Sequence, residues 1–332
     1  MDKYFLKCFA LSAGVLPERL WRAVYSLEEE DKAQAEEFRL RVGRPFAVTV
    51  GGRIKTVYFE GETVTVTEED MEECVERATK SSYHSYNHQI KEGYISLPYG
   101  GRMGVCGSVI RENGETRTIK DISSLNIRIA KQVKGVSSDI FKMIRWDKRP
   151  NILIISKAGD GKTTFLRDLV RNMSDSGIKI GLCDERYEIA ASSRGRPAFD
   201  IGRNTDVMSG GGKEQNCDAL IRAMSPSYIA LDEITKESDA DCLIKAGYMG
   251  ASFVATAHAD SIKNLGKRDI YRRLLDKDIF DYVVEIKNTD GKREIFLSEK
   301  GGQNDKNSGS SYDNRFVRVF GKVHIQTFEG QA

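Results

Sequence analysis

The second half of the chain alternates short apolar runs with stretches of helical periodicity. Four apolar runs are predicted to be strands, at residues 152–155, 178–183, 228–231 and 253–257. After the first run, apolar residues recur at the spacing of one helix face, at Phe165, Leu166, Leu169, Val170 and Met173. Strands that alternate with helices are typical of a mostly parallel sheet with helices on both faces. Residues 151–298 are therefore predicted to form an α/β domain.

The first 150 residues follow a different pattern. Helices are expected at residues 1–36 and 68–91, and strands at 46–59, 94–110 and 125–129. Gly51-Gly52 separates two alternating runs, as a hairpin turn does. This mixture predicts a smaller α+β domain over residues 1–150, with residues 146–150 as the linker to the α/β domain. The pattern itself assigns no role to this domain, for which we expect docking or oligomerisation.

Beyond residue 298 the composition changes. Residues 299–314 are rich in Gly, Ser, Asn, Asp and Lys and are expected to form a flexible linker. The alternating segment 316–325 predicts one more strand. Residues 299–332 are therefore interpreted as a linker followed by a short C-terminal tail.

The first predicted strand of the α/β domain leads directly into a glycine-rich segment, Ser156-Lys157-Ala158-Gly159-Asp160-Gly161-Lys162-Thr163-Thr164. In such a loop backbone N–H groups turn inward, and the following helix points its positive end at the same spot. The segment predicts a phosphate-binding loop for ATP, with Lys162 on the β- and γ-phosphates and the Thr163 hydroxyl on Mg²⁺. Ser156 stands where the full pattern has glycine, which serine can replace if its φ stays negative.

Two carboxylates end the strand predicted at 228–231. A magnesium ion on ATP phosphates needs hard oxygen partners, and Asp232 is expected to hold it through water. Glu233 is the expected base that orients the attacking water. Asp184 and His258 end two other strands, and ligands of such sheets bind at the carboxyl ends of strands. These side chains are therefore expected to converge on the phosphate loop.

The composition indicates an ordinary soluble globular protein. It has 332 residues, of which 40% are hydrophobic and 30% charged, with a net charge of +2. This charge favours neither nucleic acid nor anionic lipid. No stretch approaches the 18 apolar residues of a membrane span, residues 1–20 lack a clean secretory signal, and the cytoplasm is the expected compartment.

The cysteines show no metal or disulfide pattern. The six are Cys8, Cys74, Cys106, Cys183, Cys217 and Cys242. None forms a C-x-x-C pair, so neither a zinc site nor a disulfide framework is predicted.

Several further segments carry a resemblance. In the first half they are Phe38–Pro45, Gly93–Pro98, Arg102–Gly107 and Ser124–Ala130. In the second half they are the phosphate loop, Asp184–Ile189, Ile221–Pro226, Leu231–Ile234 and Ala255–His258. Over roughly residues 38–297 the chain resembles the stage III sporulation protein AA family, P-loop ATPases of endospore-forming bacteria. That family is similar to the hexameric ATPases of type II and type IV secretion and of pilus retraction.

The resemblance implies a RecA-like ATPase domain, a homo-hexameric ring and further site residues. Asp184–Glu188 is similar to the acidic box of secretion ATPases, in which Glu188 lies near Mg²⁺ and the lytic water. His258 then senses the γ-phosphate or couples subunits. Because Lys162 is the only basic side chain of the loop that is assigned to the phosphates, further positive charge is expected from the first domain or a neighbouring subunit. Arginines suited to that role are Arg102, Arg128, Arg194 and Arg196.

The expected function is that of a motor. The resemblance implies that it works in the mother cell, cytoplasmic and peripheral at the membrane, on integral membrane proteins of the channel to the forespore. The alternative is a nucleic-acid-dependent ATPase. Similar proteins of that kind carry an appended Arg-x-x-x-His module, and no histidine here has arginine four residues before it. A nucleotide-gated scaffold with little hydrolysis is a second alternative, suggested by Ser156.

Overall fold

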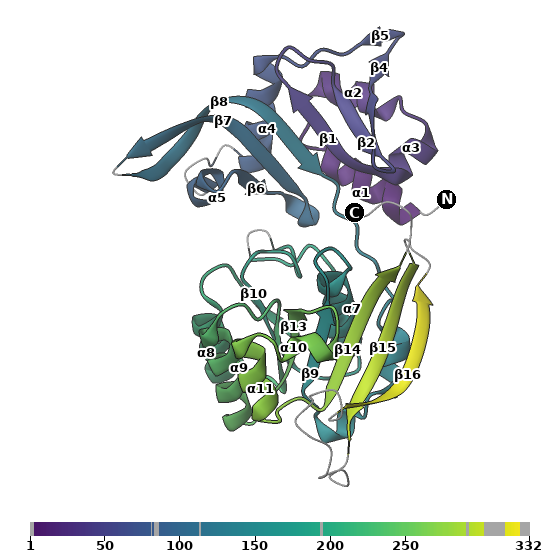
Figure 1. Ribbon diagram of the computed structural model, residues 1–332. Coiled ribbons are helices and arrows are strands. Elements are labelled where there is room, and N and C mark those ends of the chain that lie inside the picture. The colour runs from purple at the N-terminus through teal and green to yellow at the C-terminus, as the bar shows by residue number, and fades with distance from the viewer. Residues whose placement is uncertain are drawn as a thin grey trace. The chain divides into compact units, whose positions relative to one another are not determined.

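The structure is a computed structural model that describes residues 3–80, 82, 86–112, 114–192, 195–289, 292–301 and 316–325. It divides into two compact units (Figure 1). The first contains the described residues up to Lys131 and those of Ala191–Phe199, and the second contains Gln132–Ala190 and the residues from Asp200 onward. The sequence pattern places the boundary at residue 150. Residues 132–150 belong to the second unit instead, because Ile140 and Ile144 are buried in its core.

The first unit is built on an antiparallel sheet whose described strands follow the order β3-β2-β1-β8-β7-β6. These strands are β1 Ala35–Arg41, β2 Ala47–Val50, β3 Arg53–Thr56, β6 Tyr94–Ser96, β7 Arg102–Glu112 and β8 Glu115–Arg128. A small hairpin adds β4 Tyr58–Phe59 and β5 Glu62–Thr63. The helices are α1 Lys3–Ala13, α2 Glu18–Tyr25, α3 Glu29–Gln34, α4 Glu68–Thr79 and α5 Asn87–Lys91, with a 3₁₀ turn, η2, at Pro98–Gly100.

Alternation along the strands explains how helices and sheet of the first unit meet. Met103 and Val105 of β7 are buried, and they belong to one core cluster with Phe9 of α1 and Met71 of α4. The helix α4 begins where the Thr67 hydroxyl and the Asp70 carboxylate each accept the other residue's backbone N–H. The predicted α+β character of this unit is confirmed.

The second unit is built on a mixed sheet with the order β11-β10-β12-β13-β9-β14-β15-β16 among the described strands. From β11 to β14 neighbouring strands are parallel, and β15 and β16 continue antiparallel. The strands are β9 Ile152–Ser156, β10 Ile180–Asp184, β11 Thr205–Ser209, β12 Tyr228–Leu231, β13 Ser252–His258, β14 Tyr282–Thr289, β15 Lys292–Lys300 and β16 Phe316–Ile325. The helices are α6 Ser138–Met143, α7 Lys162–Asp175, α8 Lys213–Met224, α9 Glu237–Tyr248, α10 Ile262–Leu265 and α11 Asp269–Asp276, with a 3₁₀ turn, η3, at Trp146–Lys148.

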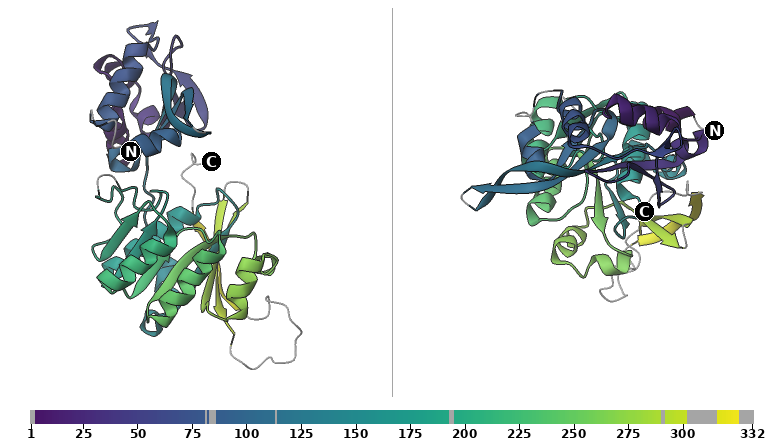
Figure 2. Two further views of the ribbon diagram at one scale, coloured as in Figure 1. Left: turned by 90° about the vertical axis from the view of Figure 1, so that its left-hand side faces the viewer. Right: turned by 90° about the horizontal axis from the view of Figure 1, so that it is seen from above.

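Helices cover both faces of this sheet (Figures 1 and 2). Ile152 and Ile154 of β9 face the core that contains α6 and α7. Leu153 and Ile155 face the opposite core, which contains α8, α9 and α11. Strands buried on both faces read as continuous apolar runs, which is why the four predicted strands were visible in the sequence. The predicted α/β fold is confirmed.

Three strands of this unit were not predicted: β11, β14 and β15. Charged residues such as Glu285, Lys287 and Glu294 interrupt the apolar pattern of β14 and β15, so no continuous apolar run marks them in the sequence. The predicted strand at 316–325 is confirmed as β16, which pairs with β15. Most of the predicted linker at 299–314 lies outside the described residues.

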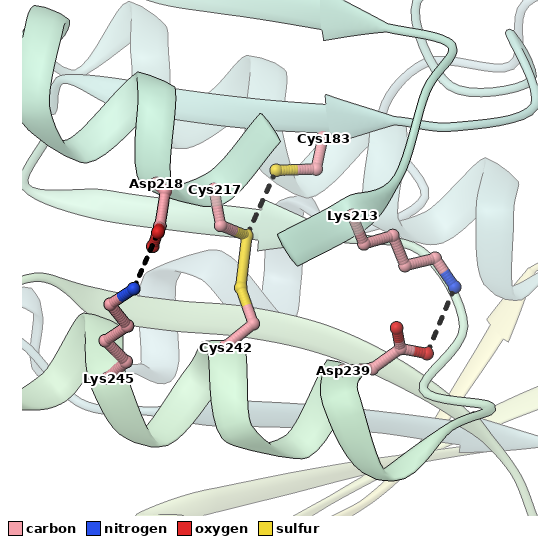
Figure 3. Close-up of a disulfide and its surroundings, with 7 residues drawn as sticks. All are labelled: Cys183, Lys213, Cys217, Asp218, Asp239, Cys242 and Lys245. Carbon is pink, nitrogen blue, oxygen red and sulfur yellow. Dashed lines mark hydrogen bonds and ion pairs between the residues drawn. A yellow bond between two sulfur atoms is a disulfide. The ribbon is translucent and has the colours of Figure 1, made fainter. Parts of the chain in front are cut away.

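The sequence predicted no disulfide framework, and it gave no sign of the disulfide found in the structure. Cys217 of α8 and Cys242 of α9 form a disulfide, and the Cys183 sulfur lies 3.3 Å from that of Cys217 (Figure 3). The two residues are 25 positions apart on successive helices. Their spacing matches no short motif, and only the packing of α8 against α9 brings them together.

In the described part of the chain, no helix is both long and apolar enough to cross a membrane.

Candidate phosphate-binding site

The predicted phosphate loop joins β9 to α7. Gly159 and Gly161 have φ values of +83° and +102°, a backbone conformation that side chains rarely adopt. Gly161 is the N-cap of α7, so the first N–H groups of that 14-residue helix open onto the loop. Ser156 keeps a negative φ, and its hydroxyl donates to the Lys157 carbonyl at 2.7 Å. The loop therefore forms with serine in place of the first glycine.

Lys162 is buried under this loop. Its ammonium donates to the Lys157 carbonyl at 2.9 Å and lies 3.2 Å from both the carbonyl and the hydroxyl oxygen of Ser156. It also lies 3.0 Å from Nδ1 of His258. Burial lowers the pKa of Lys162 from its ordinary value, and the nearby carboxylates of Asp232 and Glu233 oppose that effect. These acceptors hold the Lys162 ammonium beside the loop, where it could pair with a phosphate.

His258 connects Lys162 to Glu233. Its Nδ1 faces the ammonium, and its Nε2 lies 3.2 Å from a Glu233 carboxylate oxygen. An ammonium only donates, so Nδ1 accepts, and the ring proton on Nε2 donates to Glu233. Burial and the Lys162 charge lower the pKa of His258 below its ordinary value of 6.5, which is consistent with this neutral ring.

Asp232 and Thr163 face one another at the end of β12. The Thr163 hydroxyl donates to Asp232 Oδ2 at 3.0 Å, and the Thr256 hydroxyl donates to Oδ1 at 2.8 Å. A hydroxyl and a carboxylate beside a phosphate loop fit Mg²⁺, which keeps several waters and usually takes few protein ligands. No cluster of three metal-binding side chains occurs among the described residues, so a metal here would depend on phosphate oxygens.

Glu233 is held at both its backbone and its side chain. It has a φ of +54°, and its N–H donates to the Thr256 hydroxyl at 2.8 Å. Its carbonyl accepts from Lys213 at 2.5 Å, and its carboxylate lies 3.2 Å from Arg186. These contacts hold Glu233 in a backbone conformation that non-glycine residues adopt at a cost.

The backbone of the acidic box folds back onto the carboxylate of Asp184, its first residue. This group accepts the backbone N–H groups of Glu188, Ile189 and Ala190 at 2.8, 3.1 and 2.9 Å. Burial raises the pKa of Asp184 from its ordinary value, although these hydrogen bonds oppose it. The buried Arg167 of α7 donates to the carbonyls of Glu188 and Ile189, each at 2.6 Å. The acidic box is thereby fixed to the helix that follows the phosphate loop.

The structure brings some predicted residues together and leaves others apart. Lys162, Thr163, Asp232, Glu233 and His258 lie in one network. The Glu188 side chain is exposed. A small cavity is lined by Asp184, Glu185, Arg186, Lys213, Asp232 and Glu233. Glu185 was given no role from the sequence, yet it lines the same cavity as Asp232 and Glu233.

The predicted arginines lie elsewhere. Arg102 and Arg128 pair across β7 and β8 of the first unit, where Arg102 lies over the Tyr94 ring. Arg196 also belongs to the first unit and is exposed. Arg194 lies outside the described residues. Their role stays a prediction.

Three positioning residues were missed in the sequence. Thr256, which bonds both Asp232 and Glu233, lies in a segment that was already singled out beside His258. Lys213, at the start of α8, joins Glu185 at 3.3 Å, Asp239 at 3.4 Å and the Glu233 carbonyl. Arg186 lies within the acidic box, which was also singled out. Lys213 has no sequence signal, because the start of a helix far from Glu233 in sequence brings it there.

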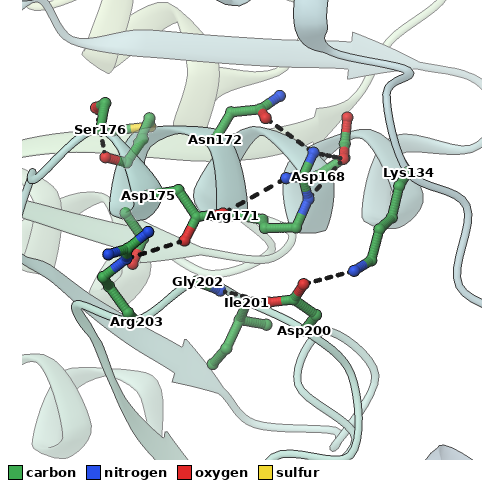
Figure 4. Close-up of polar contacts among 12 residues, drawn as sticks. Lys134, Asp168, Arg171, Asn172, Asp175, Ser176, Asp200, Ile201, Gly202 and Arg203 are labelled. Atoms are coloured by element: carbon green, nitrogen blue, oxygen red, sulfur yellow. Dashed lines mark hydrogen bonds and ion pairs between the residues drawn. The ribbon is translucent and has the colours of Figure 1, made fainter.

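The helix α7 also anchors two segments that lead to the first unit (Figure 4). Asp168 accepts the N–H groups of Gly135 and Ser137 at 3.0 and 2.9 Å. Asn204 donates its N–H to the Ser174 hydroxyl at 2.7 Å. Lys134 and Asp200 join the two segments to each other at 2.5 Å.

Comparisons with known proteins identify the family of the chain. The chain matches the family described as sporulation stage III, protein AA, over residues 13–303. Stage III sporulation protein AA of Bacillus subtilis (strain 168) is 35% identical over 285 residues, which cover 84% of this chain and 91% of that protein.

Two solved structures share the fold. The pilus retraction motor PilT with bound ADP has a TM-score of 0.54 and 15% identity, covering 84% of this chain and 81% of PilT. The Legionella pneumophila ATPase DotB has a TM-score of 0.51 and 13% identity, covering 82% of this chain and 78% of DotB. At these identities the likeness concerns the fold. The match to the sporulation family covers most of the chain, and it shows more than the fold: this protein belongs to the sporulation stage III, protein AA family.

Proposed function

We propose that the chain is an ATPase that binds Mg·ATP at the phosphate loop. The observation that carries this proposal is the contact chain from Lys162 through His258 to Glu233, beside the Thr163–Asp232 pair. A phosphate at the amino end of α7 attracts Lys162, and Mg²⁺ held by Thr163 and Asp232 would neutralise phosphate charge. The fold likeness to PilT with ADP and to the ATPase DotB supports the same ligand class.

Glu233 is proposed as the base that orients the attacking water. In the arrangement described, its carboxylate accepts from His258 and lies beside Arg186. When Lys162 turns to a phosphate, His258 loses its donor on Nδ1, so the contact between ring and carboxylate is free to change. Through His258, the binding of a phosphate can therefore change the hydrogen bonding of Glu233. Glu188 stays the alternative base, in the acidic box that Asp184 and Arg167 shape.

We further propose that the ATPase works as a homo-hexameric ring and energises a membrane-spanning channel during sporulation. Membership of a sporulation family supports the setting. The pilus motor and DotB folds support a motor rather than a scaffold. An arginine from a neighbouring subunit would complete the charge at the γ-phosphate, with Arg102, Arg128, Arg194 and Arg196 as the proposed sources.

The test is steady-state ATP turnover measured over a range of protein concentrations, with and without single-stranded DNA. We expect turnover per chain to rise with concentration as rings form, and DNA to leave it unchanged. Glu233→Gln should retain ATP binding and slow hydrolysis by roughly 10²–10⁴, whereas Lys162→Ala should lose binding.

Each alternative has its own signature in this experiment. Turnover that requires DNA would indicate the nucleic-acid-dependent ATPase. Binding without turnover in the wild type would indicate the scaffold. A Glu233→Gln variant at the wild-type rate would make Glu188 the better base, and turnover per chain that is independent of concentration would count against the ring.

A further inference from the structure

Arg293 reaches the phosphate loop from the strand β15. A Cβ atom at Gly161 would lie 3.5 Å from Nε of Arg293 and 3.6 Å from its Cζ. The guanidinium therefore lies directly against the loop, one residue before Lys162. Sequence reasoning missed Arg293 because β14 and β15 were not predicted, and it assigned the additional positive charge to the first domain or to another subunit.

The Nε–H group of Arg293 is buried and has no hydrogen-bond partner among the described residues. None of the ion pairs found between described residues involves this guanidinium. A buried donor without an acceptor is costly, and native proteins rarely keep one without a purpose. Beside a phosphate loop, an anion is the acceptor that this group lacks.

The position of β15 indicates which part of a ligand Arg293 meets. In the sheet, β14 and β15 lie on one side of β9, whereas β13 and β12 lie on the other. His258 ends β13, and Asp232 and Glu233 follow β12. Arg293 therefore approaches the loop from the side opposite the proposed base. It is placed for phosphates that stay on the nucleotide, not for the one that leaves.

We propose that Arg293 is a phosphate-binding residue for nucleoside di- and triphosphates, acting within the same chain; this rests on the proposed function. The planar guanidinium offers paired N–H donors that match two phosphate oxygens. Its contribution is to the binding of ADP and ATP alike. It differs from a charge-stabilising arginine of a neighbouring subunit, which acts on the transferring phosphate.

The test compares binding with turnover in the full-length protein. Arg293→Ala is expected to weaken ADP and ATP affinity by about 10- to 100-fold, the usual worth of a hydrogen bond to a charged group. The turnover rate at saturating ATP should change by no more than about two- to threefold, because this interaction is equal in the ground and transition states. Arg293→Lys, which keeps the charge and loses the paired donors, should fall between Ala and wild type.

The controls separate this inference from the proposed function. Arg272→Ala removes one exposed arginine of α11 that pairs with Asp269, and it should bind ADP like wild type. Tripolyphosphate, used to displace fluorescent ADP, should lose affinity in Arg293→Ala by the same factor as ADP. Thermal unfolding without nucleotide checks that each variant folds. If Arg293→Ala does not fold, Arg293→Met replaces it in the binding measurements.

Three results would overturn the inference. One is unchanged ADP affinity in Arg293→Ala while Lys162→Ala binds nothing, which leaves the proposed function standing. Another is a large fall in turnover with affinity unchanged. The third is a loss for ADP but not for tripolyphosphate, which would place the contact on the base or ribose. A wild type that binds neither ADP nor ATP would instead refute the proposed function itself.

Discussion

His258 uses both ring nitrogens, one toward Lys162 and one toward Glu233. Because burial and the Lys162 charge lower the pKa of His258, the folded state holds its ring neutral at pH values where an unfolded chain binds the proton. Between that lowered pKa and 6.5, the unfolded state binds more protons. The free energy of unfolding therefore falls as the pH falls through this window. The contribution of His258 to stability is fully present above pH 6.5.

This pH dependence can be measured by urea unfolding of the nucleotide-free protein from pH 8 to pH 5. We expect the wild type to lose stability more steeply below pH 6.5 than His258→Gln, which cannot titrate. Equal pH slopes for the two proteins would show that the ring is not held neutral by its neighbours.

At the residue level, the sequence was sufficient wherever a side chain ends a strand of the parallel sheet. Ser156 and His258 are register partners on neighbouring strands, so the motif that contains each one also places it. Arg293 and Lys213 could not be found in this way. Their positions depend on an antiparallel strand and on a helix start that carry no motif of their own.

At the scale of elements, the disulfide joins α8 to α9 beside the strand that carries the acidic box. Two ion pairs join the same helices, Lys245 with Asp218 at 2.6 Å and Lys213 with Asp239 at 3.4 Å (Figure 3). Lys213 also reaches Glu185 and the Glu233 carbonyl. The packing of this helix pair therefore supports the loop on which the proposed base lies.

Reduction of the disulfide is expected to lower the free energy of unfolding by about 3.5 kcal/mol, from the loop-closure entropy of the 25-residue separation. Denaturant unfolding with and without a thiol reductant measures this difference. Cys242→Ser should resemble the reduced wild type and should not respond to the reductant. A wild type equally stable in both conditions would show that the bond adds nothing to the fold.

Elements were predictable where apolar residues follow one another without a charged residue between them. The strands β9, β10, β12 and β13 lie inside the sheet, so each is a run of apolar residues. The strand β14 is parallel to β9 on one side and antiparallel to β15 on the other, yet Glu285 and Lys287 break its apolar run. Hydrophobic patterning thus identified the strands with uninterrupted apolar runs and missed β14, which lies inside the sheet but contains charged residues.

At the scale of the whole molecule, the two-part organisation followed from the change in patterning, but the chain path did not. The segment Ala191–Phe199 lies in the middle of the second unit's sequence but belongs to the first unit. A segment of nine residues is too short for its composition to show this. The residues after Lys131 pack through Ile140 and Ile144 with the second unit, since a short amphipathic helix can join either core.

We predict that the first unit carries recruitment to the membrane through protein partners. Expressed alone, the full chain should fractionate away from membranes. Expressed with the membrane proteins of the channel, it should move to the membrane fraction and resist a salt wash that removes electrostatic binders. A variant without residues 1–131 keeps α6 and the phosphate loop but should lose this recruitment. If that variant still reached the membrane as well as the full chain, docking would belong to the second unit.

The anchoring of two segments on α7 has a mechanical consequence. The helix α7 begins at the loop proposed to bind phosphate, and it holds two of the connections to the first unit, the one after Lys131 through Asp168 and the one after Phe199 through Ser174. A helix is stiff over such a length, and the Lys134–Asp200 pair joins the two connections. A displacement of α7 would therefore act on these two connections together. Force on the first unit and phosphate at the loop would then act on the same helix.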